Sequence, residues 1–235
     1  MVRWIGTFVL FVVTLGAADA TTILKMERVC PVGGEKYDSF MIGSTSYFGL
    51  RLDLRRNGVG AFLPYVECPN GFIVFKDEKD FTPDEIAKLT PVVASGTYRE
   101  ARQSEVDAYR VVLLRRALGA SDADLRHQLM QAAFEAEVHQ KDALHAKYLA
   151  LAAAAYTDFV KAHSEQDTEW WVAKLRLAEI ARQQGRFADA IAAIDALKGA
   201  ADPKPAVFRD VAAQIRARAE AGDKVPADFK PADGK

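Results

Sequence analysis

The sequence predicts an α+β protein that is mostly α: a small β ribbon closed by a disulfide, followed by a bundle of helices. Two observations lead to this fold class. Most of the glycine, proline and aromatic residues and both cysteines precede residue 100, and an alanine-rich stretch follows it. Each cysteine also opens a similar Cys-Pro turn. We therefore predict a β domain with a connecting helix over 21–100, an α-helical domain over 101–222 and a flexible tail over 223–235.

Residues 1–20 have the pattern of a secretory signal peptide. Arg3 gives a positive start, residues 4–15 are almost all apolar, and Ala18-Asp19-Ala20 is a small-residue cleavage site. The apolar run is shorter than the roughly 20 residues that a membrane-spanning helix needs. The alternative is an uncleaved membrane anchor. We expect a periplasmic or secreted protein without stable membrane insertion after the signal is cleaved.

The charge balance of the chain bears on whether it binds nucleic acid. Removing residues 1–20 takes away one arginine and one aspartate, so 31 basic and 32 acidic residues become 30 and 31. A net charge of −1 without a basic block argues against nucleic acid as a partner. In the oxidising space that export implies, two cysteines are expected to be paired.

The predicted β ribbon is built around the two Cys-Pro turns. A β ribbon of this size needs a metal or a disulfide, because it cannot bury enough apolar surface by itself. Residues 48–54 alternate in polarity as a half-buried strand does, and Asn57-Gly58 indicates a turn. In order, we expect a strand at 26–30, the turn 30–34, the strand 48–54, the turn 56–60, a strand at 62–68, the turn 68–71 and a strand at 71–76.

A Cys30–Cys68 disulfide would stabilise this ribbon by about 3–4 kcal/mol, because it closes a long loop. Three alternatives remain open. The two thiolates could hold zinc together with a carboxylate, or stay free, or form a redox pair. A redox pair normally has both cysteines in one short turn, whereas these are 38 positions apart.

Capping signals define the predicted helices. Thr82, Pro83 and Glu85 form a capping box with proline at the first helical position, and this helix should stop before Pro91. Ser121 is the expected N-cap of a later helix. The sequence then predicts a helix over 105–118, a helix that starts at 121 and either continues or breaks near His139, and an alanine-rich stretch of helix over 144–160.

Part of this pattern resembles a known family. The segments Cys30-Pro31-Val32-Gly33-Gly34, 47–53, 66–72 and 82–85 resemble an uncharacterised bacterial family with a zinc-ribbon-like pair of Cys-Pro turns followed by tetratricopeptide-like helices. The second cysteine of each pair is Gly33 or Gly71 here, so half of the zinc ligands are lost. The resemblance therefore implies no metal and no cofactor.

Residues 170–197 resemble a tetratricopeptide repeat, a helical hairpin of about 34 residues. The turn Gly185-Arg186-Phe187 followed by Ala190 carries the resemblance, and Asp202-Pro203 should start a third helix. One hairpin cannot bury its own face, so neighbouring helices must cover it.

No catalytic motif is found: a Gly-x-Ser-x-Gly nucleophile turn is missing, and the histidines at 127, 139, 145 and 163 are interpreted as solvated. We expect a non-catalytic adaptor whose helical groove binds an unknown protein or peptide. The alternatives are a metal-binding protein, an envelope enzyme or a structural part of an envelope assembly. We expect one tryptophan of the pair at 170–171 in the core and the other in the groove. The candidate groove residues are Trp170, Trp171, Lys174, Arg182 and Arg186.

Overall fold

The computed structural model describes residues 23–42, 45–59, 64–197 and 206–231. This part of the chain contains six short strands and eight α-helices, which confirms the mostly-α member of the α+β class. The predicted signal peptide and the predicted helix start at Asp202-Pro203 lie outside the described residues.

The strands form three separate antiparallel hairpins instead of one ribbon. The prediction of a turn at Asn57-Gly58 is wrong, because both residues lie within a strand. The chain turns earlier, where Arg51 donates its backbone N–H to the carbonyl of Arg55 (2.8 Å) and Leu54 adopts a left-handed φ of 62°. The pairs are β1 (Ile23–Val29) with β2 (Lys36–Ile42), β3 (Ser46–Leu50) with β4 (Arg56–Val59), and β5 (Val66–Glu67) with β6 (Ile73–Val74).

The helices begin where the capping signals predict. Both capping boxes, Thr82 with Glu85 and Ser121 with Asp124, are present, and the break near His139 is confirmed. The predicted stop before Pro91 is wrong: the helix gives up the one hydrogen bond that proline cannot make and continues for another turn. The helices are α1 (Pro83–Ala94), α2 (Gly96–Ser104), α3 (Asp107–Ala117), α4 (Asp122–Val138), α5 (Asp142–Ala162), α6 (Thr168–Gln183), α7 (Phe187–Asp195) and α8 (Val207–Glu220).

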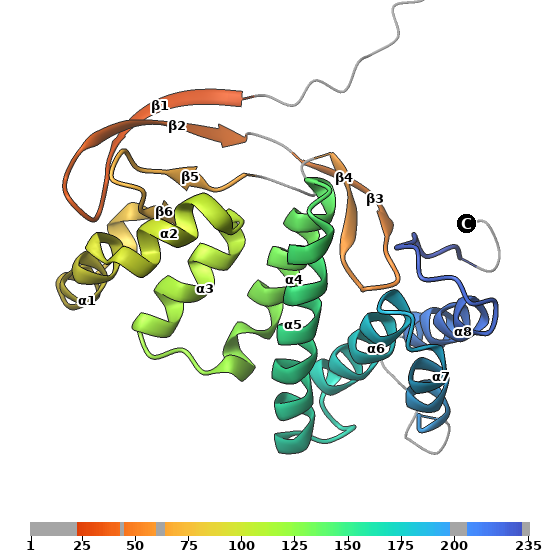
Figure 1. Ribbon diagram of the computed structural model, residues 1–235. Coiled ribbons are helices and arrows are strands. Elements are labelled where there is room, and N and C mark those ends of the chain that lie inside the picture. The colour runs from red at the N-terminus through yellow and green to blue at the C-terminus, as the bar shows by residue number, and fades with distance from the viewer. Residues whose placement is uncertain (1–22, 43–44, 60–63, 198–205, 232–235) are drawn as a thin grey trace, which may run out of the picture.

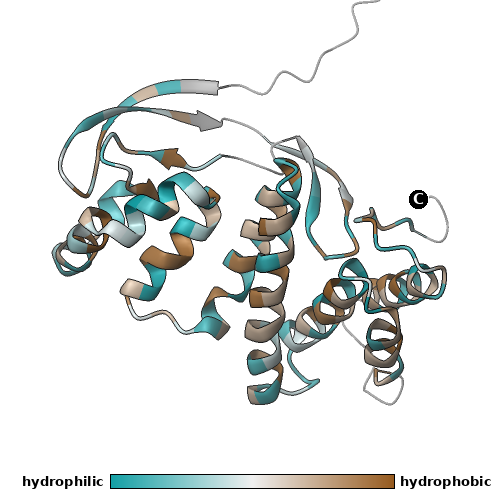
Figure 2. Ribbon diagram, in the orientation of Figure 1, coloured by the Kyte–Doolittle hydropathy of each residue, from teal (hydrophilic) through white to brown (hydrophobic). Residues whose placement is uncertain are grey.

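Figure 1 shows the helices following one another in chain order from α1 to α8, with the strands along one edge of this array. The helical hairpin predicted for residues 170–197 is present as α6 and α7, and α8 packs against both helices. The central pair, α4 and α5, packs closely through alanine-rich faces. In Figure 2 hydrophobic positions run along both of these helices.

The buried cores do not divide at residue 100. One core joins the two Cys-Pro turns to α1, α2 and α3. Another joins Leu50 and Leu52, from the β3–β4 hairpin, to Trp171 and Leu175 on α6 and to α8. The segment 21–100 is therefore shared between two groups of helices instead of packing as one unit.

Part of the predicted flexible tail, residues 227–229, is paired with the β3–β4 hairpin. Leu52 donates its N–H to the carbonyl of Ala227 (3.0 Å), and Phe229 donates to the carbonyl of Leu50 (2.7 Å). Arg51 and Asp228 form a β-bridge between these two bonds. The tail pairs with the end of β3 because Leu52 and Phe229 bury apolar surface in the same core.

Candidate functional site

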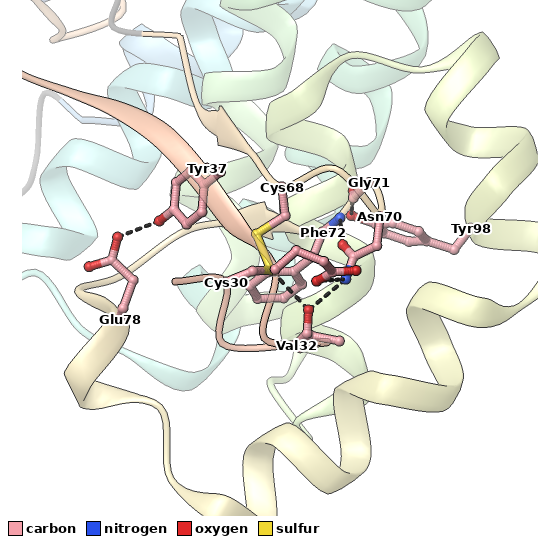
Figure 3. The surroundings of a disulfide bond; sticks show 10 residues. Cys30, Val32, Tyr37, Cys68, Asn70, Gly71, Phe72, Glu78 and Tyr98 are labelled. Atoms are coloured by element: carbon pink, nitrogen blue, oxygen red, sulfur yellow. Dashed lines mark hydrogen bonds between the residues drawn. A yellow bond between two sulfur atoms is a disulfide. The ribbon is translucent and has the colours of Figure 1, made fainter. Parts of the chain in front are cut away.

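The Cys30–Cys68 disulfide is present, with Cα atoms 5.9 Å apart, and it lies buried between the two Cys-Pro turns (Figure 3). Each turn is closed by a backbone bond from its cysteine: Cys30 donates to Glu35, and Cys68 donates to Phe72, both at 2.8 Å. Because both sulfurs are used in this bond, the thiolates considered above as zinc ligands do not exist in the folded chain.

Besides the disulfide, hydrogen bonds from the side chain of Asn70 join the two turns. Its side-chain N–H₂ group donates to the carbonyl of Val32 (2.5 Å) and to the carboxylate of Glu35 (3.1 Å). Gly33 adopts a left-handed φ of 97°, and a Cβ there would lie only 2.3 Å from Glu35 Oε2 and 2.7 Å from Asn70 Nδ2. A cysteine in place of Gly33 would therefore displace this bridge. Among the residues that the structure describes, no three His, Cys, Asp or Glu side chains are grouped to hold a metal ion.

The predicted groove residues do not share one surface. Trp170 is half-buried near the start of α6, with Lys174 Nζ 5.5 Å from its ring centroid. Trp171 is buried, and its indole N–H donates to the carbonyl of Glu165 (3.0 Å). Arg186 is exposed and pairs with Asp189 (2.6 Å). It follows the other end of α6, about 20 Å along the helix axis from Trp170 at 1.5 Å per residue.

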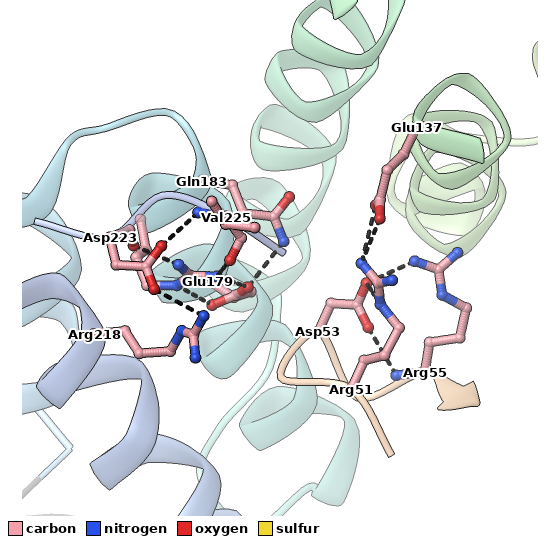
Figure 4. A network of polar contacts seen from close by, with 10 residues as sticks. Arg51, Asp53, Arg55, Glu137, Glu179, Gln183, Arg218, Asp223 and Val225 are labelled. Atoms are coloured by element: carbon pink, nitrogen blue, oxygen red, sulfur yellow. Dashed lines mark hydrogen bonds and ion pairs between the residues drawn. The ribbon is translucent and has the colours of Figure 1, made fainter. Parts of the chain in front are cut away.

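Arg182 is not a surface residue, and its assignment to a groove is corrected. Its guanidinium is fully buried and forms two parallel bonds to the carboxylate of Glu179, at 2.6 and 2.8 Å. It also donates to the carbonyls of Asp223 and Val225 in the tail. Figure 4 shows Glu179 at the centre of this network. Arg182 therefore attaches the tail to α6.

A polar cavity of about 200 Å³ opens between the β3–β4 turn, α4 and α6. No local pattern in the sequence indicates this cavity, because its charged residues lie far apart in the chain. The cavity is lined by Asp53, Arg55, His127, Met130, Gln131 and Arg176.

One wall of the cavity is the buried carboxylate of Asp53. Arg55 donates to it from the backbone N–H (3.0 Å) and from Nη2 (2.7 Å), and Arg51 Nε lies 3.5 Å away. Burial alone would raise the pKa of Asp53, but the guanidinium groups of Arg55 and then Arg51 outweigh burial, so this pKa is lowered. Arg51 extends the network to Glu137 with bonds of 2.9 and 3.0 Å (Figure 4).

The lining also contains His127 and Arg176, and Arg176 Nε donates to the backbone carbonyl of Asp53 (2.9 Å). Arg176 Nη1 lies 2.5 Å from His127 Nδ1, and a guanidinium can only donate, so Nδ1 accepts and Nε2 carries the proton. His127 Nε2 then donates to Glu169 (3.1 Å). Burial, followed by the charges of Arg176 and Arg126, lowers the pKa of His127. Both ring nitrogens of His127 are therefore engaged, Nδ1 by Arg176 and Nε2 by Glu169.

The most exposed aromatic side chains in the described part of the chain lie on two consecutive hairpins. Phe48 is 74% exposed, Phe40 is 59% exposed and Tyr47 is 49% exposed. The alternation over 48–54 correctly places Leu52 in the core, yet it leaves Phe48 in solvent, because no element covers the start of β3. The sequence pattern did not predict that these three aromatic side chains would be exposed.

Comparison with protein-family models, with curated proteins and with solved structures finds no similar protein. Within the described ranges, no helix has the length and apolar character needed to cross a bilayer.

Proposed function

We propose that this protein is an exported, non-catalytic binding protein that holds a partner protein against its β2 and β3 strands. The observation that best supports this is the exposure of Phe40, Tyr47 and Phe48 on consecutive hairpins. Solvated aromatic side chains are enriched in protein interfaces, where they supply most of the binding energy. This surface replaces the helical groove of the sequence-based hypothesis, since Trp171 and Arg182 are buried.

Export is supported by the signal pattern of residues 1–20 and by the buried disulfide, which belongs in an oxidising compartment. Mass spectrometry of the native protein tests this directly. We expect the mass of a chain that begins after Ala20, reduced by two hydrogens for the disulfide. A chain recovered from the cytoplasm with two free thiols would contradict export.

The binding surface is tested with a photo-crosslinking amino acid at Tyr47, in cells that express the protein. Phe40→Ser combined with Phe48→Ser should reduce the crosslinked partner at least tenfold, the effect of losing about 1.4 kcal/mol of binding energy. Val138→Ser is the matched control, because Val138 is also an exposed apolar residue but lies at the end of α4. Equal crosslinking by all three chains would exclude this surface.

The polar cavity supports a second candidate function, the binding of a small carboxylate. Its lining has two guanidinium groups, Arg55 and Arg176, and one carboxylate, Asp53, which Arg55 and Arg51 already hold. Arginine forks match the geometry of carboxylates. Gln131 adds an amide and Met130 an apolar wall. At about 200 Å³ the cavity exceeds the 150 Å³ that holds benzene in an engineered protein cavity.

Acetate, succinate and phosphate are the probes for this second function, added at millimolar concentration while amide resonances of α4 and α6 are followed by NMR. We expect acetate or succinate to shift the resonances around the cavity in a saturable manner. Gln131→Trp should fill the cavity and abolish the shifts, whereas Gln131→Ala should keep them. Equal shifts with all probes and in both variants would show only a general salt effect and would reject the site.

A further inference from the structure

The β1–β2 hairpin is a separate two-stranded sheet among the described strands, and its buried Tyr37 and Ser39 face the rest of the molecule. Its strands pair with each other over seven residues, from Ile23 opposite Ile42 to Val29 opposite Lys36. It is attached near its turn, through the disulfide and through Arg28 and Tyr37, which both contact Glu78. In Figure 1 the open end of the hairpin extends away from this attachment, along the edge of the helical array. A two-stranded hairpin is marginally stable in water unless more strands or a packed face support it.

The outer edge of β1 is open in the described part of the chain, where β1 pairs with β2 alone. An open edge presents unpaired N–H and C=O groups and is a template for another strand. Proteins commonly protect such an edge with charged side chains. On β1 the flanking charges are Lys25 and Glu27, whose side chains are 62% and 64% exposed. Each also forms an ion pair with β2, Lys25 with Asp38 and Glu27 with Lys36, both at 2.8 Å, and at this exposure such a pair leaves the charge accessible to a second partner.

These two charges are arranged so that they attract a second copy of β1. Met26 lies between them and is the middle residue of the strand. When two β1 strands run antiparallel with Met26 opposite Met26, all seven residues overlap. Lys25 of each copy then lies opposite Glu27 of the other, and opposite charges in directly facing positions stabilise a strand pair. Centring the pair on residue 25 or on residue 27 would instead place like charges opposite each other.

The edge of β2 does not offer the same pairing. Lys36 and Asp38 flank Tyr37 in a similar way, but Lys36 is the first residue of the strand. An antiparallel pair centred on Tyr37 would overlap over only three residues. Tyr37 is also buried and bonded to Glu78 beside the disulfide turn, so this end of the hairpin is held against the body of the protein.

We propose that two copies of this protein associate through their β1 edges, antiparallel and centred on Met26, to form a four-stranded sheet in the order β2–β1–β1–β2. A two-fold axis passes between the two Met26 residues, so the interface is self-complementary and closed. Four strands give the hairpin the support that two strands lack. The partially exposed Met26 side chains are covered by each other.

Oxidative crosslinking tests the register. In Met26→Cys the two introduced thiols face each other across the axis, where Cα atoms of paired residues are about 4.5–5.5 Å apart. They should form an intermolecular disulfide rapidly under mild oxidation. Val29→Cys is the matched control, an exposed residue of the same strand whose two copies would lie about 20 Å apart at 3.3 Å per residue. Peptide mapping confirms that Cys30–Cys68 remains intact in both variants.

Charge exchange tests the complementarity. Lys25→Glu and Glu27→Lys should each be monomeric by light scattering, because each places like charges across the axis. An equimolar mixture of the two variants should form a heterodimer, since each strand then faces the opposite charge. Two results together would overturn the proposal. The wild type would be monomeric at about 100 μM, a concentration at which a dimer with a micromolar dissociation constant would be formed, and Met26→Cys and Val29→Cys would crosslink equally.

Discussion

The β1–β2 and β3–β4 hairpins are both too small to bury a core of their own, and the molecule attaches them to its helices in different ways. The first hairpin is fastened by the Cys30–Cys68 bond, close to its turn. The second has no covalent tie among the described residues. It is held by the ion pair of Arg51 with Glu137 on α4, by the hydrogen bond from Arg176 on α6 to the backbone carbonyl of Asp53, and by the paired tail. A covalent tie depends on redox conditions, whereas an ionic tie depends on protonation and on both partners being present.

The two attachments also differ in the sequence separation of the residues that they join. The disulfide joins two turns that are 38 residues apart in the chain. The polar network joins Arg51 to the carboxylate of Glu137 and Arg176 to the backbone carbonyl of Asp53, across 86 and 123 residues of chain. The comparison indicates that the first hairpin can be released without disturbing α6–α8, while the second hairpin, the tail and α6 should loosen together. The following predictions test this difference.

Removing Arg182 should have the largest effect. Arg182→Leu leaves the Glu179 carboxylate buried without its cation and should lower the free energy of unfolding by about 3–5 kcal/mol. Urea unfolding measures the loss, and amide exchange should show weaker protection at Leu52 and Phe229. Arg186→Leu is the control, because its exposed pair with Asp189 is worth at most about 1 kcal/mol. Similar losses in both variants would contradict the role assigned to the buried pair.

Removing the disulfide should have the second-largest effect on stability. Cys30→Ser combined with Cys68→Ser should destabilise the protein by about 3–4 kcal/mol through the loop that the bond closes. Hydrogen exchange should accelerate in β1, β2, β5 and β6 and stay unchanged in α6 and α8. Faster exchange throughout α6–α8 would show that the two attachments are not independent.

Acid should act on the second attachment. The folded pKa of Asp53 is lowered relative to the unfolded value of about 3.9. Its ionised form therefore stabilises the fold above about pH 4, and this contribution is lost as the pH falls through the folded pKa. Unfolding measured between pH 6 and pH 2, about two units above and below the unfolded pKa, should show a steeper loss for the wild type than for Asp53→Asn. Equal slopes would mean that Asp53 does not contribute.

The smallest effect on stability is expected at the N-cap of α1, a helix that packs in the same core as the disulfide. Thr82→Ala removes the side chain that accepts from the N–H of Glu85 and should cost about 1 kcal/mol. Thr90→Ala, an exposed change within the same helix, serves as the control. Thermal unfolding compares the two variants. An equal change in both would show that the capping box adds nothing measurable.

The features that were predicted correctly are those with local causes. The capping residues Thr82 and Ser121 act on backbone groups three positions away, so sequence spacing identifies them. The helical hairpin of α6 and α7 follows from its turn, Gly185-Arg186-Phe187. The Cys30–Cys68 pairing was predictable because the chain has only two cysteines.

The remaining features depend on partners that are distant in the sequence. Asn57-Gly58 is a common turn pair, but burial of Leu52 among α6, α8 and the tail moves the turn to Leu54. Arg182 and Arg186 look alike as cations of one helical hairpin, and only the position of Glu179 and the tail distinguishes the buried one. The cavity was missed for the same reason, because Asp53, His127 and Arg176 come from three separate elements.

The clasp between the β3–β4 hairpin and the tail sets an order of events during synthesis. Asn57 and Asp228 form a hydrogen bond across 171 residues of chain. At 5–20 residues per second, the ribosome makes the hairpin about 10–30 s before the segment that closes over it. The backbone N–H of Leu52 lacks its partner, the carbonyl of Ala227, throughout that interval, so the hairpin can reach its final attachment only after α6, α7 and α8 have been made.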